Sequence, residues 1–188
     1  MTKEERALLS QLDEIVNSEE VRSRIDPIVQ RVREDLAAKP EALMAWEPVA
    51  LETFGENLPS NIESAWVFVL RAGADTGAER HPNSHQRMMT FAGTGDMKID
   101  AKGTPNEVEA ESEIAWHSHV LVSDPKAPLE RRWISIPKNI WHRPVIPSGA
   151  EWAVVSFHTV SPAELIEERP GARQMLYEDE RNRDDQAV

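Results

Sequence analysis

Apolar residues near the N-terminus recur with the spacing of amphipathic helices over residues 4–40. A first stripe consists of Leu8, Leu9, Leu12, Ile15 and Val16. Ser18 is a suitable N-cap for a second helix, whose stripe consists of Val21, Ile25, Ile28, Val29, Val32 and Leu36. Pro27 lies inside this second pattern and should kink or divide the helix, and Pro40 should end it. We expect both stripes to pack on the remainder of the fold.

From about residue 46 the pattern changes to short apolar runs that are separated by turn residues. Glycines in the run Gly93-Thr-Gly-Asp96 predict a tight turn between two strands. We predict strands at residues 65–70, 88–92, 97–100, 108–116, 132–136, 140–146 and 152–160. Short strands at this spacing, with no helical pattern between them, indicate a mainly β fold, an antiparallel sandwich or barrel.

The last predicted strand is followed by a typical helix start, Ser161-Pro-Ala-Glu164, which predicts a short helix to about Glu168. The charged run from Glu178 to Asp185 is typical of a solvated tail. We therefore divide the chain into an N-terminal helical extension (1–45), a β-barrel (46–162) and a C-terminal helix with an acidic tail (163–188).

Composition narrows the possible functions. A chain of 188 residues suits one domain with its own core. The absence of cysteine excludes disulfides, thiolate metal sites and cysteine nucleophiles. A formal net charge of −12 argues against nucleic-acid binding. The charged N-terminal sequence lacks the apolar run of a signal peptide, and no stretch approaches the ~20 apolar residues of a membrane span. We therefore expect a cytoplasmic protein without membrane contact.

The six histidines are distributed unevenly, since all of them lie between residues 81 and 158. Imidazole is a metal ligand, and it is also an acid–base group that titrates near neutral pH. This distribution therefore predicts a metal or acid–base site in the middle of the chain.

Two segments resemble the two motifs of the cupin superfamily. The first runs Gly77-Ala-Glu-Arg-His-Pro-Asn-Ser-His-Gln-Arg-Met-Met-Thr-Phe-Ala-Gly93, and the second runs Ile136-Pro-Lys-Asn-Ile-Trp-His-Arg-Pro144. In cupins a pair of ligands precedes a strand that ends at glycine, and a turn containing proline precedes a histidine. The resemblance implies a jelly-roll-type antiparallel β-barrel that holds one metal ion.

Residues two positions apart on a strand point to the same side, so Glu79 and His81 could face the barrel interior together. His142, on a distant strand, could complete the ligand set. Cupins usually carry His-x-His followed by Glu, whereas this chain has Glu79 at the first position and Gln86 where the later Glu is expected. The third ligand is therefore open among Glu79, His85 and Gln86, and we favour Glu79.

Two imidazoles and one carboxylate form the facial triad of non-haem Fe(II) oxygenases, which leaves coordination positions for substrate and O2. We predict Fe(II) as the cofactor. Mn, Ni and Zn remain alternatives, because the same ligand types accommodate them.

Within the superfamily, the chain looks most like the thiol dioxygenase (cysteine dioxygenase-type) branch over roughly residues 60–165. Its run Glu79-Arg-His-Pro-Asn-Ser-His-Gln86 resembles the pattern His-x-His-x-x-Ser-His-Cys of that branch. Its run Ser156-Phe-His-Thr-Val-Ser-Pro162 resembles the pattern Ser-x-His-x-Tyr-Ser-Pro. The resemblance implies that Ser156 and His158 form a hydrogen-bonded catalytic relay beside the metal, and we expect His85 to assist by orienting a ligand.

The chain departs from this branch at several positions. Val160 replaces the relay tyrosine, and Gln86 replaces the cysteine that cross-links to that tyrosine in some members. The substrate-carboxylate arginine is missing too, because residues 47–70 contain no Arg or Lys. We expect Arg71 or Arg87 to substitute, with Gln86 as a further substrate-binding residue. The departures argue against cysteine itself as substrate.

Three functions are compatible with the sequence. The first is an Fe(II) dioxygenase that acts with O2 on a small organic substrate, thiols among the candidates. The second is a metal cupin that catalyses a non-redox isomerase or lyase reaction. The third is a cupin that binds a small ligand without catalysis. A homodimer could form through the barrel edges or the N-terminal helices.

Overall fold

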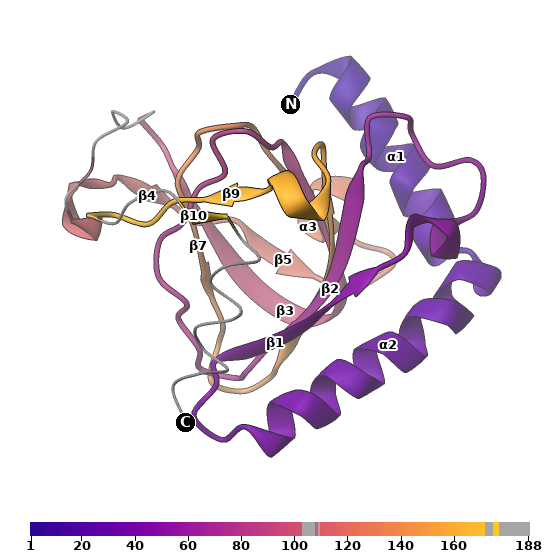
Figure 1. Ribbon diagram of the computed structural model, residues 1–188, viewed down its shortest axis with the longest axis horizontal. Helices are drawn as coiled ribbons and strands as arrows, with labels where there is room; N and C mark the ends of the chain where they lie inside the picture. Colours follow the sequence, from indigo (N-terminus) through magenta and orange to yellow (C-terminus); the bar gives the residue numbers. More distant parts are fainter. Residues whose placement is uncertain (103–107, 109, 172–174, 177–188) are drawn as a thin grey trace.

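The structure, a computed structural model, describes residues 1–102, 108, 110–171 and 175–176. Two helices, α1 (Lys3–Asn17) and α2 (Glu19–Ala38), lie along one side of an antiparallel β-barrel (Figure 1). The barrel strands are β1 (Met44–Val49), β2 (Ser64–Leu70), β3 (Gln86–Asp100), β4 (Trp116–His117), β5 (Val120–Val122), β6 (Trp133–Ile136), β7 (His142–Val145) and β8 (Trp152–His158).

Short elements complete the fold. A separate ribbon is formed by β9 (Ile166–Glu167) and β10 (Met175–Leu176). The single-turn helices are η1 (Leu51–Phe54), η2 (Glu111–Glu113), α3 (Leu129–Arg132) and η3 (Pro162–Glu164). Over the described part of the chain, no helix combines the length and the apolar character that crossing a membrane requires.

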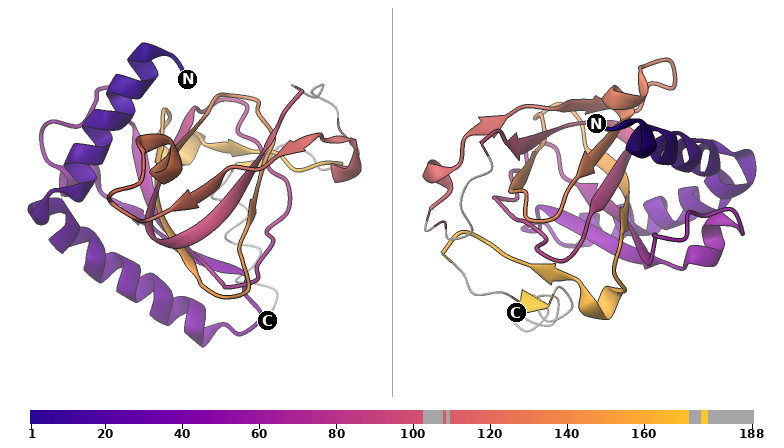
Figure 2. Two further views of the ribbon diagram at one scale, coloured as in Figure 1. Left: turned by 180° about the vertical axis from the view of Figure 1, so that it is seen from behind. Right: turned by 90° about the horizontal axis from the view of Figure 1, so that it is seen from above.

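The long strand β3 organises the barrel, because it pairs with strands on both sides of the fold (Figure 2). Its first half, Gln86 to Gly93, pairs with β8 and β6, and β8 continues through β2 to β1. Its second half, from Thr94 on, pairs with β5, β7 and β4. One strand therefore passes from one sheet to the other and joins them.

Two glycines allow β3 to make this passage. A register shift between Thr90 and Ala92 precedes Gly93, which has a φ of +78°. A Cβ atom there would lie 2.0 Å from the carbonyl oxygen of Glu151, and a Cβ at Gly95 would lie 2.2 Å from the Trp152 ring. Only glycine fits either position, so the glycines bend the strand and seat the indole inside the barrel. The predicted turn at residues 93–96 is therefore wrong: the chain continues as one strand.

Both faces of the central strands are buried, and successive side chains alternate between two cores. The outer core lies between the sheet and the helices and includes Val67, Val69, Val155 and Phe157 together with the apolar stripes of α1 and α2. The inner core fills part of the barrel and includes Leu70, Met88, Met97, Trp152 and Val154. The predicted packing of the helical stripes on the barrel is confirmed.

The break between α1 and α2 lies at Ser18, and α2 is not interrupted at Pro27. The Ser18 hydroxyl accepts a hydrogen bond from the backbone N–H of Val21, as predicted for an N-cap. α2 continues through Pro27, although an interior proline costs roughly 3 kcal/mol. The free energy gained by burying the apolar face of α2 against the sheet outweighs that cost. This face consists of Val21, Ile25, Val29, Val32 and Leu36.

The structure differs from the prediction at two further segments. Of residues 108–116, predicted as a strand, the described part forms η2 and the start of β4. The helix predicted from Ser161 to about Glu168 is only the single turn η3, followed by β9, because Ile166 pairs with a neighbouring ribbon strand instead of continuing the helix. The charged run from Glu178 to Asp185 lies outside the described residues.

A partly buried ion pair fastens α1 to the barrel. Glu5 accepts hydrogen bonds from Arg87 Nε at 2.7 Å and Nη2 at 3.0 Å, and from the Ser135 hydroxyl at 2.7 Å. Burial raises the pKa of Glu5, but the hydrogen bonds from Arg87 and Ser135 and the charges of Arg87 and His85 outweigh it and lower the pKa. The Arg87 side chain is only 4% exposed, so its charge depends on this carboxylate.

Replacing Glu5 by glutamine should lower the free energy of unfolding by about 2 kcal/mol at pH 7, because it leaves a buried guanidinium without its counter-charge. Urea unfolding measures this loss. The folded pKa of Glu5 lies below its ordinary value of 4.5, so the wild-type contribution is present above pH 4.5 and disappears as the pH falls through the folded pKa. The difference between variant and wild type should therefore shrink in acid, and a difference independent of pH would contradict the assignment.

Candidate metal centre

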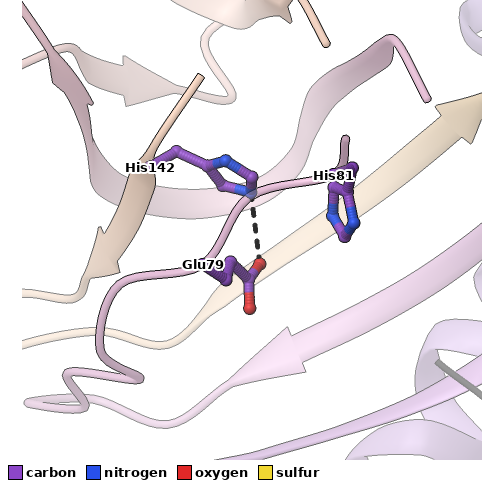
Figure 3. A group of neighbouring side chains, drawn as sticks. All are labelled: Glu79, His81 and His142. Carbon is purple, nitrogen blue, oxygen red and sulfur yellow. Dashed lines mark ion pairs between the residues drawn. The ribbon is translucent and has the colours of Figure 1, made fainter. Parts of the chain in front are cut away.

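Three side chains of metal-ligating type converge where the segment of Glu79 and His81 meets the start of β7 (Figure 3). One potential ligand atom from each of Glu79, His81 and His142 lies within 4.8 Å of the others. The backbones of Glu79 and His142 form a mutual antiparallel bridge, with N–H to carbonyl distances of 2.9 and 2.8 Å. This bridge brings the two motif segments, some sixty positions apart in the chain, to a common site.

Backbone carbonyls orient both imidazoles. His81 Nδ1 donates to the carbonyl of Ile166 at 3.0 Å, and His142 Nδ1 donates to the carbonyl of Ile140 at 3.1 Å. A carbonyl can only accept, so each neutral ring carries its proton on Nδ1. Nε2 of each ring therefore retains a lone pair, which is the state that a metal ion requires.

The closest pair at the site consists of two acceptors. His142 Nε2 lies 3.2 Å from Glu79 Oε1, and the His142 side chain is fully buried. Within the described residues, this nitrogen has no hydrogen-bonding partner. A carboxylate oxygen and an imidazole lone pair at this distance are held together only by a cation between them, either a proton or a metal ion. The residues present therefore fit a divalent ion.

The electrostatics favour the ligand forms of these groups. Burial alone raises the pKa of Glu79, but its contact with His142 and the electrostatic effects of His142, His81 and Arg169 outweigh burial and lower the pKa to about 2. Burial, together with the neighbouring His142, lowers the pKa of His81 to about 4. At neutral pH the site thus presents a carboxylate and, at His81, a neutral imidazole.

His158 lies beside the three ligand-type residues, with its ring centroid 5.1 Å from that of His81. Its Nδ1 is 3.2 Å from the Ser84 hydroxyl and its Nε2 is 3.2 Å from the Ser156 hydroxyl. Gln86 Nε2 donates to the same Ser156 oxygen at 3.1 Å. Burial lowers the pKa of His158 well below its ordinary value, so the ring is neutral and both nitrogens belong to a continuous hydrogen-bonded chain.

A cavity of about 40 Å³ adjoins the site. Its polar lining consists of Thr76, Glu79, His81, Gln86 and His158. Its apolar lining consists of Met44, Trp66, Phe68, Leu70, Met88, Met97, Pro144, Trp152, Val154 and Leu165. A single water molecule needs roughly 10–15 Å³, so the space suits a ligand of a few non-hydrogen atoms.

Strand alternation decides which predicted site residues reach this cavity. Gln86, Ser156 and His158 share the inward parity of Met88 and Val154. His85 and Arg87 have the opposite parity and contact Glu5 and Ser135 beneath α1. The structure therefore does not bring His85 or Arg87 to the cavity, and neither the third-ligand role nor the catalytic role considered for His85 has geometric support.

Arg71, predicted to bind substrate, is also placed elsewhere. Its guanidinium donates to the carbonyls of Leu36, Lys39 and Ala42 at distances of 2.7 to 3.1 Å. These carbonyls lie at the end of α2 and just beyond it, and those of Leu36 and Lys39 also accept backbone hydrogen bonds, so Arg71 reinforces the C-terminal cap of the helix. Arg71 is not part of the cavity lining.

Several contributors were not predicted from the sequence. Ser84 lies within the first motif, but its contact with His158 requires a strand more than 70 positions away. Arg169 Nη2 lies 3.5 Å from Glu79 Oε2 and comes from the segment after β9. The Ile166 carbonyl is invisible to motif reasoning, since any residue type supplies a backbone oxygen.

No protein-family model matches the chain, and no curated protein matches it. Solved structures do resemble it. The capsular polysaccharide assembling protein CapF from Staphylococcus aureus has a TM-score of 0.50 and 8% identity, over 70% of this chain and 33% of CapF. Oxalate oxidase in complex with the substrate analogue glycolate has a TM-score of 0.46 and 12% identity, over 73% of this chain and 56% of that protein.

An oxalate decarboxylase structure has a TM-score of 0.44 and 9% identity, over 73% of this chain and 29% of that protein. The chain thus spans between about a quarter and about half of the length of the structures that it matches. At 8% identity, the likeness to CapF shows a shared fold. Together with the observed strand order, it confirms the fold predicted from the two motifs, an antiparallel β-barrel of the cupin type with helices at its N-terminus.

Proposed function

We propose that the protein is an Fe(II)-dependent dioxygenase that acts on a small organic substrate. The observation that carries the proposal is the buried contact between Glu79 Oε1 and His142 Nε2, two acceptors 3.2 Å apart that need a cation between them. With His81, they supply the two imidazoles and one carboxylate of a facial triad. When bound, Fe(II) would supply the redox chemistry and coordinate O2 and substrate together.

The protein's own residues would position the reactants and handle protons. His81 and His142 are fixed by carbonyl contacts on Nδ1, so their Nε2 lone pairs stay directed at the ion. The apolar part of the cavity lining would exclude water from the reaction. His158 Nε2, hydrogen-bonded to Ser156, would accept or return a proton, because the ring is neutral and lies next to His81.

Thiols are one class of substrate to test. The pairing of His158 with Ser156 supports the likeness to the thiol dioxygenase branch. Val160, at the position of the relay tyrosine, packs with Trp66 and Leu165 and offers no hydroxyl. We therefore infer that proton transfer here would end at His158 and Ser156.

The purified full-length protein should bind one divalent ion. At a free concentration of 100 times its Kd, the ion should raise the free energy of unfolding by about 2.7 kcal/mol, which corresponds to roughly 5–10 °C in Tm. His142→Ala and Glu79→Gln should abolish most of this shift, measured by thermal unfolding with and without Fe(II) under argon.

His85→Gln serves as the matched control, because it removes the other imidazole considered as a third ligand while sparing the cavity. This variant should keep the metal-dependent shift. Loss of the shift in His85→Gln, with its retention in Glu79→Gln, would assign the third ligand the other way. Elemental analysis of protein prepared without chelator provides the stoichiometry.

The Fe(II)-loaded protein should consume O2 in an oxygen electrode when it meets its substrate in a panel of small thiols and diketones. His81→Ala and His142→Ala should lower the rate by about 100-fold or more, because each removes a ligand. His158→Gln should lower it by about 100-fold at unchanged metal content, because it removes the proton acceptor. His117→Gln, at an exposed position, should not change the rate.

Turnover of a panel compound without O2, with Zn, Mn or Ni in the site, would instead select the isomerase or lyase alternative. A protein without stoichiometric metal that still binds a small ligand would select the non-catalytic alternative. Either result would replace the dioxygenase proposal.

A further inference from the structure

We infer that the cavity selects a small uncharged molecule that bears a hydrogen-bond donor, and that Gln86 and Thr76 determine this selectivity. This inference rests on the proposed metal centre, since it names the class of substrate that the centre would receive. It is based on buried polar atoms of the cavity lining that have no hydrogen-bond partner within the described residues.

Two buried polar atoms of the lining residues have no hydrogen-bond partner within the described part of the chain: Gln86 Oε1 and Thr76 Oγ1. Gln86 is 6% exposed, and its Nε2 is already committed to Ser156. The free Oε1 can only accept a hydrogen bond. A buried amide oxygen without a donor carries a desolvation cost, which a ligand with an N–H or O–H group would remove.

The charges of the lining side chains disfavour an anionic group on the Gln86 side of the cavity. Among the described residues that line the cavity, none is Lys or Arg, and Glu79 contributes a carboxylate. The nearest arginine, Arg169, is engaged by Glu167 Oε1 at 2.8 Å, by the Thr76 carbonyl at 3.0 Å and by Glu79. A substrate carboxylate placed against Gln86 would therefore meet an amide oxygen with no Lys or Arg of the described lining to offset its charge, so an anionic group could be accommodated only at the metal ion itself.

The apolar walls define the remainder of the ligand. Trp66, Phe68, Met88 and Trp152 line the cavity, and its volume of about 40 Å³ admits only a few non-hydrogen atoms inside. The expected occupant thus combines a short apolar part with a neutral donor group, such as an amide, an alcohol or a neutral thiol. A ligand of the same size whose carboxylate faces Gln86 should bind more weakly.

A matched pair of probes tests this selectivity. Propionamide and propionate have nearly the same shape, but only the amide is neutral and carries a donor. Binding to the metal-free protein can be followed by tryptophan fluorescence, because Trp66 and Trp152 line the cavity. The metal is left out because a bound ion would itself coordinate the propionate carboxylate. We expect wild-type protein to bind propionamide at least tenfold more tightly than propionate.

Gln86→Leu removes the free acceptor and should weaken propionamide binding by about fivefold to tenfold, which is the weight of one hydrogen bond. Propionate binding should stay equal or tighten. Thr76→Val should act in the same direction and should not destabilise the fold, since the hydroxyl has no partner to lose. Gln86→Glu keeps acceptor oxygens at the position, so it should retain propionamide binding and weaken propionate binding further.

If Gln86→Leu does not fold, Thr76→Val and Gln86→Glu still decide the matter. Equal changes for both probes in these variants, no change for either, or tighter binding of propionate by the wild type would overturn the inference. A lack of O2 uptake would count against the dioxygenase alone and would not alter these titrations. A failure to bind Zn²⁺ in a separate titration would count against the metal centre and would leave the results with the metal-free protein unchanged.

Discussion

The alternation of side chains along strands that are buried on both faces is the constraint on which the rest of this structure depends. In β8 every residue is buried, and parity alone sends Val155 and Phe157 toward the helices and Ser156 and His158 toward the barrel interior. The same rule in β3 separates Gln86, which reaches the cavity, from Arg87, which holds α1. A change of register by one residue would turn Ser156 and His158 toward the helices and would turn Val155 and Phe157 into the barrel interior.

Much of the fold and the centre of the candidate site could be predicted from the sequence. The spacing within the two motifs brought out His81 and His142, and the rule that residues two apart share a face pointed to Glu79. The structure brings these three side chains together, because their convergence depends on local spacing and on one long-range pairing, which the backbone bridge between Glu79 and His142 supplies. The short apolar runs likewise predicted most of the strands.

The sequence could not show which side chains of a strand buried on both faces point into the barrel. Residues Gln86 to Met89 are all buried, so no alternation of polar and apolar residues distinguishes Arg87 from its neighbours, and two arginines were placed near the substrate on chemical grounds alone. The turn predicted at Gly93 was wrong for another reason. In the sequence, a glycine that a bend in a strand requires cannot be distinguished from a glycine that a turn requires. The cap that Arg71 provides depends on where α2 ends relative to β2, which no local pattern encodes.

The contact between His81 and the Ile166 carbonyl couples the candidate metal centre to the segment that follows the barrel. That carbonyl selects the tautomer of His81, and the segment itself is anchored by Asn83, which bonds the backbone at Glu164 and Ile166, and by the ion pair between Arg80 and Glu168. Arg80 and Asn83 flank His81 in the sequence, so the loop that carries His81 and the segment from Glu164 to Glu168 are held together as one unit. Displacing the segment that bears the Ile166 carbonyl would allow the His81 ring to rotate. Binding of an ion would then weaken, although none of the candidate ligands had been changed.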